Sequence, residues 1–541
     1  MILKKSTYWI VLLLISSFVS VGYYNQLSTS NITAALKLFN IEFSKKNTKT
    51  LLPYIKRNQK GYANMRTFAL NKNTQPAFSF NLPIKNTQYI NLQFEEDSTS
   101  IIKDEKEIAF LPISKLAYLI KNKLISSEKL TKIYLNRIKK YNKDLNVIVT
   151  LTENLAIKQA KKADLELNKG LYRGLLHGIP YGIKDLASFP GYPTTWGAEP
   201  YKNQLINEKA EVIQILEESG AVMLGKLSSG ALARGDVWFG GKTKNPWDLN
   251  QGSSGSSAGS ASATAAGLVG FSIGTETLGS IISPSTRCGV SGLRPTYGSV
   301  STNGFMTLSW SMDKIGPIAR TAKGCAIVFN KIQKKEGLNK INKSFNKNVN
   351  NLKVAFLEGL FLNDTSRYAK NNTKTLAFIK RKIPVLHPTS LPKKFPFDVF
   401  DIILRAEAGA FFDEFLLTKK DETMVEQGEK SRANSLRQSR LIPAVEYIQA
   451  NRFRTKLIEE TNKIFNNYDI IISPSFGKNQ LLITNLTGHP AISIPNGLDE
   501  NNRPTSITFI ANYYQEDVLL SFVNSIQKET NHHLNKPPLF Y

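Results

Sequence analysis

Short apolar runs alternate with helical stretches along most of this 541-residue chain, and this alternation limits the possible fold more than any other feature. The spacing of apolar residues separates strand-like from helix-like segments. The strand-like runs are Gly178–Ile183, Ala221–Leu224, Asp469–Ile472 and Ala491–Pro495, and the helical stretches include Glu208–Ser219 and Gln515–Glu529. Such a sequence predicts an α/β domain whose sheet is largely covered by helices.

The main domain is expected to span residues 106–541 and to open with two amphipathic helices. Ser114–Lys123 has apolar residues at helical spacing, and Ser126 or Ser127 is expected to cap a second helix. Residues 335–400 are rich in Lys and Asn and weakly patterned, which predicts a variable insert within the domain.

Residues 1–24 have the pattern of a signal peptide or an N-terminal membrane anchor. Lys4 and Lys5 precede the uncharged run Tyr8–Tyr24, which is just long enough to span a bilayer. Cleavage and retention of this segment are both open, and in either case we expect the protein to be exported or membrane-anchored, on the periplasmic side in a bacterium. Residues 25–105 are rich in Asn, Lys, Ser and Thr and are expected to form an irregular spacer that contains a strand or two and no chemistry.

The formal charge of +27 does not indicate a nucleic-acid partner. The basic residues are mostly lysines spread along the chain between asparagines, and no nucleic-acid-binding motif accompanies them. Two cysteines, Cys288 and Cys325, make no disulfide framework, and no Cys/His cluster indicates a metal. We therefore expect a small-molecule substrate, with the oligomeric state open.

The segment Gly252–Gly267 consists wholly of Gly, Ser, Ala and Thr, and its second half is competent to form a helix. Because it stands between structured segments, we expect a Gly-rich loop that opens a helix rather than a flexible linker. Within it, Gly255–Gly259 matches the nucleophile elbow of α/β-hydrolases, which would make the chain an esterase using Ser257. That elbow must follow a strand and needs a later histidine, whereas the preceding residues are loop-like and the five histidines are poorly placed.

A turn of small hydroxyl residues, Gly274–Ser285, follows the strand-like run Leu268–Ile273 and contains Ser280. Such a turn can direct several backbone N–H groups at one point, as an oxyanion hole requires. Serine needs a base to act as a nucleophile. Lys184 ends the apolar run Gly178–Ile183, where desolvation would lower its pKa and supply a free amine. These residues predict Ser–Lys catalysis.

Seven segments resemble the amidase-signature family and occur in family order within residues 111–541: GIPYGIKDL (178–186), GKLSSGA (225–231), NPWD (245–248), GSSGSSAGSASA (252–263), GTETLGSIISPSTRCGVSGLRPTYGSVS (274–301), SMDKIGPIART (311–321) and NLTGHPAISIP (485–495). The resemblance implies a single large α/β domain with a mixed twisted sheet covered by helices on both faces. It also implies an amidase that hydrolyses a carboxamide C–N bond without metal or cofactor.

The resemblance also implies a set of catalytic residues. Carried over by position, the family's lysine is Lys184, its cis-peptide serine is Ser253 and its nucleophile is Ser280. The oxyanion hole consists of backbone N–H groups, those of Thr277, Leu278, Gly279 and Ser280. In the family, the lysine takes a proton through the bridging serine, the nucleophile forms an acyl-enzyme with loss of ammonia or an amine, and water releases the acid.

Leu278 stands where many members have Gly or Asp, and Ile282 where many have Arg. These departures bear on the turnover rate and on the preferred charge of the substrate. The sequence does not identify the acyl and amine groups of the substrate. The family includes amidotransferase subunits acting on charged tRNA, a cytoplasmic substrate that export argues against. A different class is a catalytically impaired, membrane-tethered amidase-like binding protein; intact Lys184, Ser253 and Ser280 argue against it.

Overall fold

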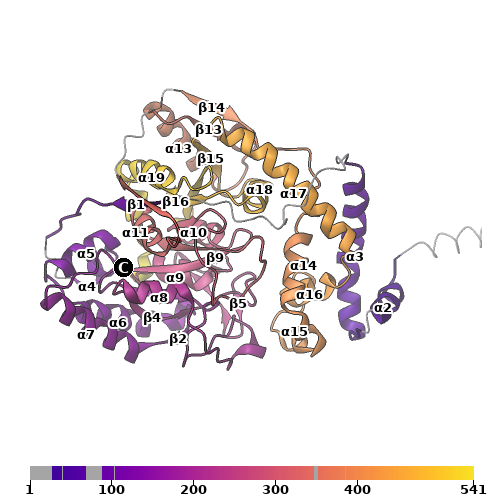
Figure 1. The fold of residues 1–541 in the computed structure, drawn as a ribbon, viewed down its shortest axis with the longest axis horizontal. Coiled ribbons are helices and arrows are strands. Elements are labelled where there is room, and N and C mark those ends of the chain that lie inside the picture. Colours follow the sequence, from indigo (N-terminus) through magenta and orange to yellow (C-terminus); the bar gives the residue numbers. More distant parts are fainter. Residues whose placement is uncertain are drawn as a thin grey trace, which may run out of the picture.

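The computed structural model describes residues 27–38, 41–68, 88–100, 102, 104–345, 351–383 and 385–541, and within these residues a mixed sheet of eleven strands forms its centre (Figure 1). Two groups of three neighbouring strands, β15–β13–β14 and β9–β3–β4, are parallel, and the other neighbours are antiparallel. The predicted mixed α/β sheet is therefore confirmed. In spatial order the strands are β14 (Leu386–Thr389), β13 (Val354–Leu357), β15 (Ile470–Pro474), β17 (Pro504–Ala511), β16 (Ala491–Leu498), β10 (Ser291–Arg294), β11 (Lys314–Ala319), β9 (Phe271–Glu276), β3 (Pro180–Lys184), β4 (Val222–Leu227) and β2 (Ile148–Leu151).

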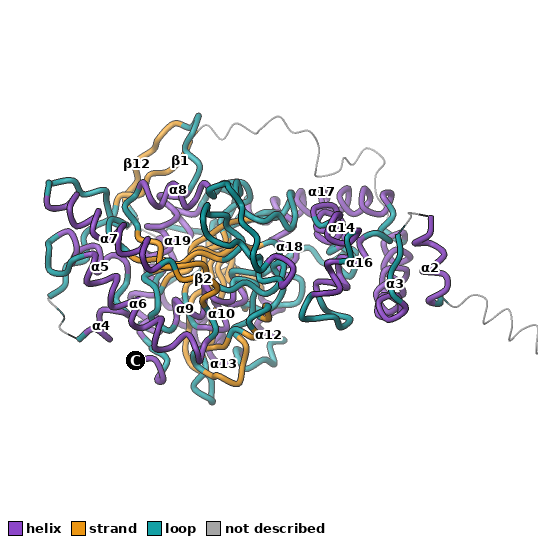
Figure 2. Tube along the Cα trace, turned by 90° about the horizontal axis from the view of Figure 1, so that it is seen from below, coloured by secondary structure: helices purple, strands orange, loops and turns teal. Residues whose placement is uncertain are grey.

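Helices cover both faces of this sheet, as the continuous burial of its central strands requires. Figure 2 shows α8 and α19 on one side of the strands and α9 and α10 on the other. The helices around the sheet are α4 (Glu105–Ala109), α5 (Ile113–Lys121), α6 (Ser127–Leu145), α7 (Glu153–Asn168), α8 (Glu211–Glu218), α9 (Ala258–Ala265), α10 (Ile282–Cys288), α11 (Ala322–Ile332), α12 (Glu358–Leu362), α13 (Ala369–Lys382), α18 (Gln480–Thr487) and α19 (Glu516–Thr530). Ser126 caps α6 by accepting the N–H of Lys129, as the sequence predicts.

A second group of helices, which we call the helical lobe, stands beside the sheet and its covering helices (Figure 1). It comprises α2 (Thr29–Leu38), α3 (Lys45–Arg66), α14 (Ile402–Phe411), α15 (Asp413–Leu417), α16 (Arg432–Ser439) and α17 (Ala444–Phe465). The apolar residues of α14–α17, with Tyr62 and Met65 of α3, share one hydrophobic cluster with Leu357, Ile471 and Ile510 of the sheet. Ile32 and Leu36 of α2 form a separate small cluster with Leu51 of α3. The lobe is thus continuous with the core of the domain.

Two segments outside the best-patterned part of the sequence contain more regular structure than their composition indicates. Residues 25–105 contain the helices α2 and α3, which the predicted irregular spacer does not include, and one strand, β1 (Gln88–Gln93). Within residues 335–400, for which a variable insert is predicted, β13 and β14 extend the central sheet, and β12 (Asn339–Ser344) pairs with β1 in parallel. In both segments short structured stretches lie among Lys and Asn residues that obscure the apolar pattern.

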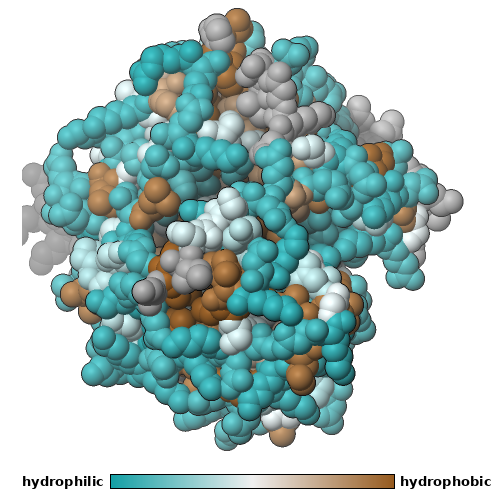
Figure 3. Space-filling view, turned by 90° about the vertical axis from the view of Figure 1, so that its left-hand side faces the viewer, coloured by the Kyte–Doolittle hydropathy of each residue, from teal (hydrophilic) through white to brown (hydrophobic). Residues whose placement is uncertain are grey.

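Two short hairpins, β5 (Val237–Trp238) with β6 (Gly241–Lys242) and β7 (Lys244–Asn245) with β8 (Asp248–Gly252), lead into the Gly/Ser-rich segment. On the face of the molecule that Figure 3 presents, hydrophilic residues dominate and apolar residues gather near the centre. A largely hydrophilic surface is what a chain of this Lys and Asn content predicts.

Candidate active site

Lys184 ends β3 in the interior of the sheet, with its side chain fully buried. Its Nζ lies 2.8 Å from Ser256 Oγ and 2.9 Å from Thr275 Oγ1. Burial lowers the pKa of Lys184 to about 7, although the carboxylates of Asp313 and Glu276 act in the opposite direction. The predicted low-pKa amine is therefore present, and near neutral pH a large fraction of it is free to accept a proton.

Ser253 does not lie in the position that the resemblance implies for the bridging serine. Its N–H donates to the carbonyl of Thr243, which keeps it at the end of the β7–β8 hairpin, and its hydroxyl donates to the carbonyl of Ser254. Ser256 contacts Lys184 instead, and the cis peptide bond lies between Gly255 and Ser256. The choice of Ser253 is therefore corrected to Ser256.

The sequence holds a signal for this correction. The triplet Gly-Ser-Ser occurs twice, at 252–254 and 255–257, and only the second directly precedes α9, which begins at Ala258. A loop that opens a helix places its last residues, not its first, at the helix N-terminus. Counting back from the Ala-rich helix selects Ser256.

Ser257, the nucleophile of the elbow alternative, is fully buried. Its hydroxyl donates to the carbonyl of Thr275 and accepts the N–H of the same residue, both at 3.1 Å. Among the histidines, His489 is stacked between Phe465 and Tyr513, and burial lowers its pKa to about 3. Ser257 therefore joins α9 to β9, and no histidine in the described part of the chain is among the hydrogen-bond partners of its hydroxyl.

Ser280 lies at the end of the turn that follows β9, and its side chain is partly exposed whereas Ser256 and Ser257 are buried. The Ser280 carbonyl accepts the N–H of Ser257. This bond holds the turn against the loop that carries Ser256. Gly279 has a φ of 89°, in the left-handed region where glycine meets no Cβ clash. Leu278 keeps a negative φ, so its side chain does not disturb the turn.

Within the residues that the structure describes, the N–H groups of Leu278, Gly279 and Ser280 have no protein acceptor. The next two N–H groups, those of Ile281 and Ile282, both donate to Glu276, at 2.7 and 2.8 Å. Three adjacent free donors beside an exposed serine can stabilise a developing oxyanion. The N–H of Thr277 likewise has no protein acceptor in the described part of the chain, and the Thr277 hydroxyl donates to Asp313 at 2.5 Å.

Glu276 forms a fully buried ion pair with Arg294, with 3.0 Å between Oε1 and Nη1. Burial alone would raise the pKa of this carboxyl, but Arg294 and the N–H donors hold it below its usual range. The pair sits directly behind the turn of Ser280 and positions it.

Replacing Arg294 should therefore destabilise the fold strongly. Arg294→Met leaves the Glu276 carboxylate buried without its counter-charge, and we expect a loss of about 3–5 kcal/mol in the free energy of unfolding. Urea denaturation measures this loss. The control is Lys132→Met, which removes an ion pair with Glu128 in which Lys132 is 55% exposed and should change stability by less than about 1 kcal/mol. Equal effects of the two replacements would contradict this role of the buried pair.

Sequence reasoning missed one charged residue near the site. Arg432, the first residue of α16, is buried and donates to the carbonyls of Leu232 and Ala233, at 2.9 and 3.0 Å. Burial lowers the pKa of Arg432 to about 9, and its positive charge adds to the lowering of the pKa of Lys184. No motif in the sequence indicates this residue.

Comparison with known proteins decides the family. A model of the Amidase family matches residues 129–484. The chain belongs to the amidase family. The glutamyl-tRNA(Gln) amidotransferase subunits A of Acinetobacter baylyi and of Coxiella burnetii RSA 493 are each 30% identical, over 79% of this chain and 97% and 99% of theirs. As a member of this family the chain is an enzyme that acts on amide bonds.

Several solved structures share the fold. The peptide amidase of Stenotrophomonas maltophilia has a TM-score of 0.70 at 23% identity, covering 80% of this chain and 99% of that one. A 6-aminohexanoate cyclic dimer hydrolase has a TM-score of 0.68 at 19% identity, covering 80% of this chain and all of that one. These likenesses confirm the architecture.

The expectation of export or membrane anchoring is wrong. The curated relatives are named as glutamyl-tRNA(Gln) amidotransferase subunits A. Amidotransferase subunits that act on charged tRNA are the class of family member that an export signal argues against. Residues 1–24, on which the expectation rests, lie outside the described part of the chain. No helix in the described part is long and apolar enough to cross a membrane.

Proposed function

We propose that this amidase hydrolyses a carboxamide through an acyl-enzyme on Ser280, with Ser256 as the bridging serine and Lys184 as the base. The observation that carries the proposal is the 2.8 Å contact between Lys184 Nζ and Ser256 Oγ in a fully buried setting. A buried amine with a pKa of about 7 suits general-base work at neutral pH. The nearby turn supplies both the nucleophile and free N–H donors.

The reaction then follows in two halves. Ser280 Oγ attacks the carbonyl carbon while its proton passes to Ser256 Oγ and the proton of Ser256 passes to Lys184 Nζ. The free backbone N–H groups of this turn, including those of Leu278, Gly279 and Ser280, donate hydrogen bonds to the oxyanion. Collapse breaks the C–N bond, the amine leaves with the proton returned through Ser256, and the acyl-enzyme remains. Water attacks the ester by the same proton path and releases the acid.

The two Gly-Ser-Ser triplets provide a matched test of the bridging serine. Ser256→Ala removes the proton relay and should lower kcat/KM by about a hundredfold or more. Ser253→Ala removes only a hydroxyl bonded to the neighbouring Ser254 carbonyl and should stay within about threefold of the parent enzyme. Ammonia release from a panel of primary carboxamides, peptide amides and fatty amides measures both and identifies the substrate class. A severe loss in Ser253→Ala with a mild one in Ser256→Ala would reverse the assignment.

A second candidate function comes from the curated relatives, which are amidotransferase subunits for glutamyl-tRNA(Gln). An amidotransferase would cleave an amide donor at the same site and deliver the ammonia to another acceptor. The two functions differ in where the nitrogen goes. Ammonia release by the purified chain, with no other protein and no tRNA, supports the hydrolase; activity only when a glutamyl-tRNA acceptor and further subunits are added supports the amidotransferase.

A further inference from the structure

The helix α3 lies outside residues 129–484, which the family model matches, yet it packs against α16 in the helical lobe (Figure 1). Its buried face is partly polar: Asn47, Thr48, Leu51, Tyr54, Asn58, Tyr62 and Met65 are buried at helical spacing. A buried polar face needs specific hydrogen-bond partners, unlike an apolar one. The contacts of α3 are therefore specific in position.

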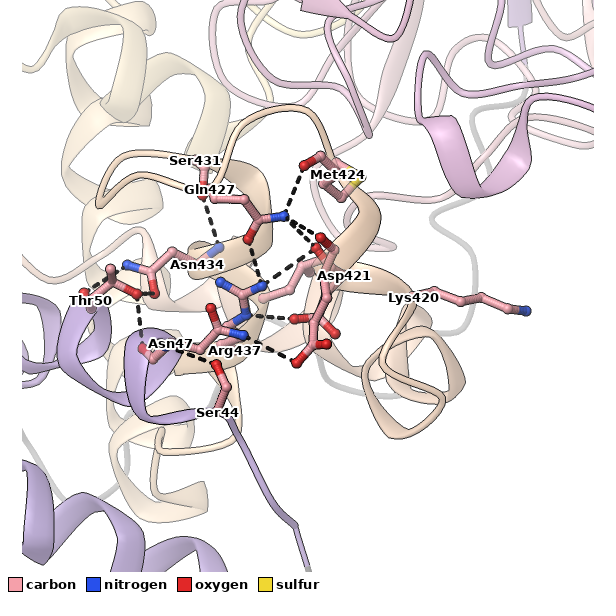
Figure 4. A network of polar contacts seen from close by, with 12 residues as sticks. Ser44, Asn47, Thr50, Lys420, Asp421, Met424, Gln427, Ser431, Asn434 and Arg437 are labelled. Carbon is pink, nitrogen blue, oxygen red and sulfur yellow. Dashed lines mark hydrogen bonds and ion pairs between the residues drawn. The ribbon is translucent and has the colours of Figure 1, made fainter.

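The main partner of this polar face is α16, a helix whose eight residues are all buried although its sequence is RANSLRQS. Asn58 Nδ2 donates to Gln438 Oε1 at 3.0 Å. Asn434 Nδ2 donates to the Thr50 carbonyl at 3.0 Å, and Thr50 Oγ1 lies 3.3 Å from Asn434 Oδ1 (Figure 4). These bonds fix both the position of α16 and its rotation about its axis.

The other side of α16 is held by a second set of polar contacts. Arg437 Nε donates to Asp421 Oδ2 at 2.5 Å, and its Nη2 donates to Gln427 Oε1 at 2.8 Å. Gln427 in turn donates to the carbonyls of Asp421 and Met424 (Figure 4). With α3 on one side and this turn on the other, α16 has a single well-defined placement.

The first residue of α16 connects this placement to the active site. Arg432 donates to the carbonyls of Leu232 and Ala233, which both have a positive φ, 48° and 60°, that non-glycine residues keep only when neighbours hold them. The loop formed by residues 230–236 packs against the loop that carries Gly255 and Ser256. Gly230 N–H donates to the Ser256 carbonyl at 3.3 Å, and a Cβ on Gly255 would lie 1.7 Å from the carbonyl oxygen of Gly235.

We propose that α3 is a positioning element of the active site: through Asn58 and Thr50 it fixes α16, and α16 places Arg432 so that it anchors the 230–236 loop beside Ser256 and Lys184. The inference rests on the proposed roles of Ser280, Ser256 and Lys184. Asn58 is a positioning residue in this scheme and touches no substrate. The positive charge of Arg432 favours the neutral form of Lys184 and so lowers the pKa of Lys184. The pKa of Lys184 is therefore the quantity by which this scheme can be measured.

The test is the pH dependence of the rate at which a fluorophosphonate labels Ser280 in the full-length protein. Asn58→Ala loosens α16 and should move the midpoint of the acidic limb to higher pH, by about half a unit or more. Gln59→Ala is the matched control, because Gln59 is the next residue of the same helix and is exposed; its midpoint should equal that of the parent. Arg432→Gln should raise the midpoint directly, and adding Asn58→Ala to it should cause no further shift.

The outcomes separate the inference from the function on which it rests. A merely structural Asn58 would lower the thermal midpoint and the labelled fraction but leave the pH midpoint unchanged, and that result would overturn the inference. If Asn58→Ala does not fold, the pH midpoint of labelling is measured in Thr50→Val instead. This variant keeps the backbone carbonyl that accepts from Asn434, and an unchanged midpoint would again overturn the inference. Failure of the parent protein to label at Ser280 would instead reject the proposed function.

Discussion

Ser280→Ala should abolish amide hydrolysis and fluorophosphonate labelling, with a fall in kcat of about 10⁴-fold or more, as removal of a catalytic nucleophile produces elsewhere. The attacking oxygen of the proposed mechanism is lost in this variant. The partly exposed side chain contributes little to packing. The thermal unfolding midpoint should therefore stay within a few degrees of the parent value.

Ser283→Ala is the matched control for this prediction. Ser283 lies three residues further on, at the start of α10, and is also partly exposed. We expect near-parent activity and labelling. Mass spectrometry of the labelled parent enzyme should place the adduct on Ser280; an adduct on Ser257, or activity retained in Ser280→Ala, would restore the esterase alternative.

Lys184→Arg should be nearly as inactive as Lys184→Met, each losing about a thousandfold or more of kcat/KM. A guanidinium stays protonated near neutral pH, so it cannot take the proton from Ser256. Keeping an amine neutral in the interior opposes folding at pH 7, by about 1.4 kcal/mol for each unit by which its pKa is lowered. Lys184→Met should therefore be no less stable than the parent protein, as thermal unfolding can measure.

Substantial activity in Lys184→Arg would contradict general-base catalysis by this residue. His489→Phe is the corresponding control for a histidine mechanism. Because His489 is packed between two aromatic rings and its pKa is lowered to about 3, a phenyl ring should preserve most of the activity.

The positions of candidate residues can be predicted from the sequence where each residue lies in its own strand or turn. Lys184 ends an apolar strand and Ser280 ends a hydroxyl-rich turn, so local pattern places both. Local pattern does not identify the bridging serine. Whether Ser253 or Ser256 reaches Lys184 depends on where the β7–β8 hairpin ends, and the Thr243 carbonyl, a non-local partner, sets that point.

The helical lobe shows the other limit of prediction. The buried side of α3 includes Asn47, Thr48 and Asn58, so its hydrophobic periodicity is weak and its composition resembles that of a spacer. The same holds for α16, which is buried but polar throughout most of its length. Elements stabilised by side-chain hydrogen bonds across long sequence separations leave little trace in a single sequence.

The pH dependence of Ser280 labelling in the parent enzyme tests the central claim most directly. Lys184 must be neutral to accept a proton, and its pKa lies at about 7. We expect the labelling rate to rise between about pH 6 and pH 8 along a single limb and then to level off. The midpoint of this rise should be the same in His489→Phe. A rate that keeps rising to about pH 10, the range of an ordinary lysine, or a midpoint that shifts when His489 is replaced, would contradict a Lys184–Ser256–Ser280 site.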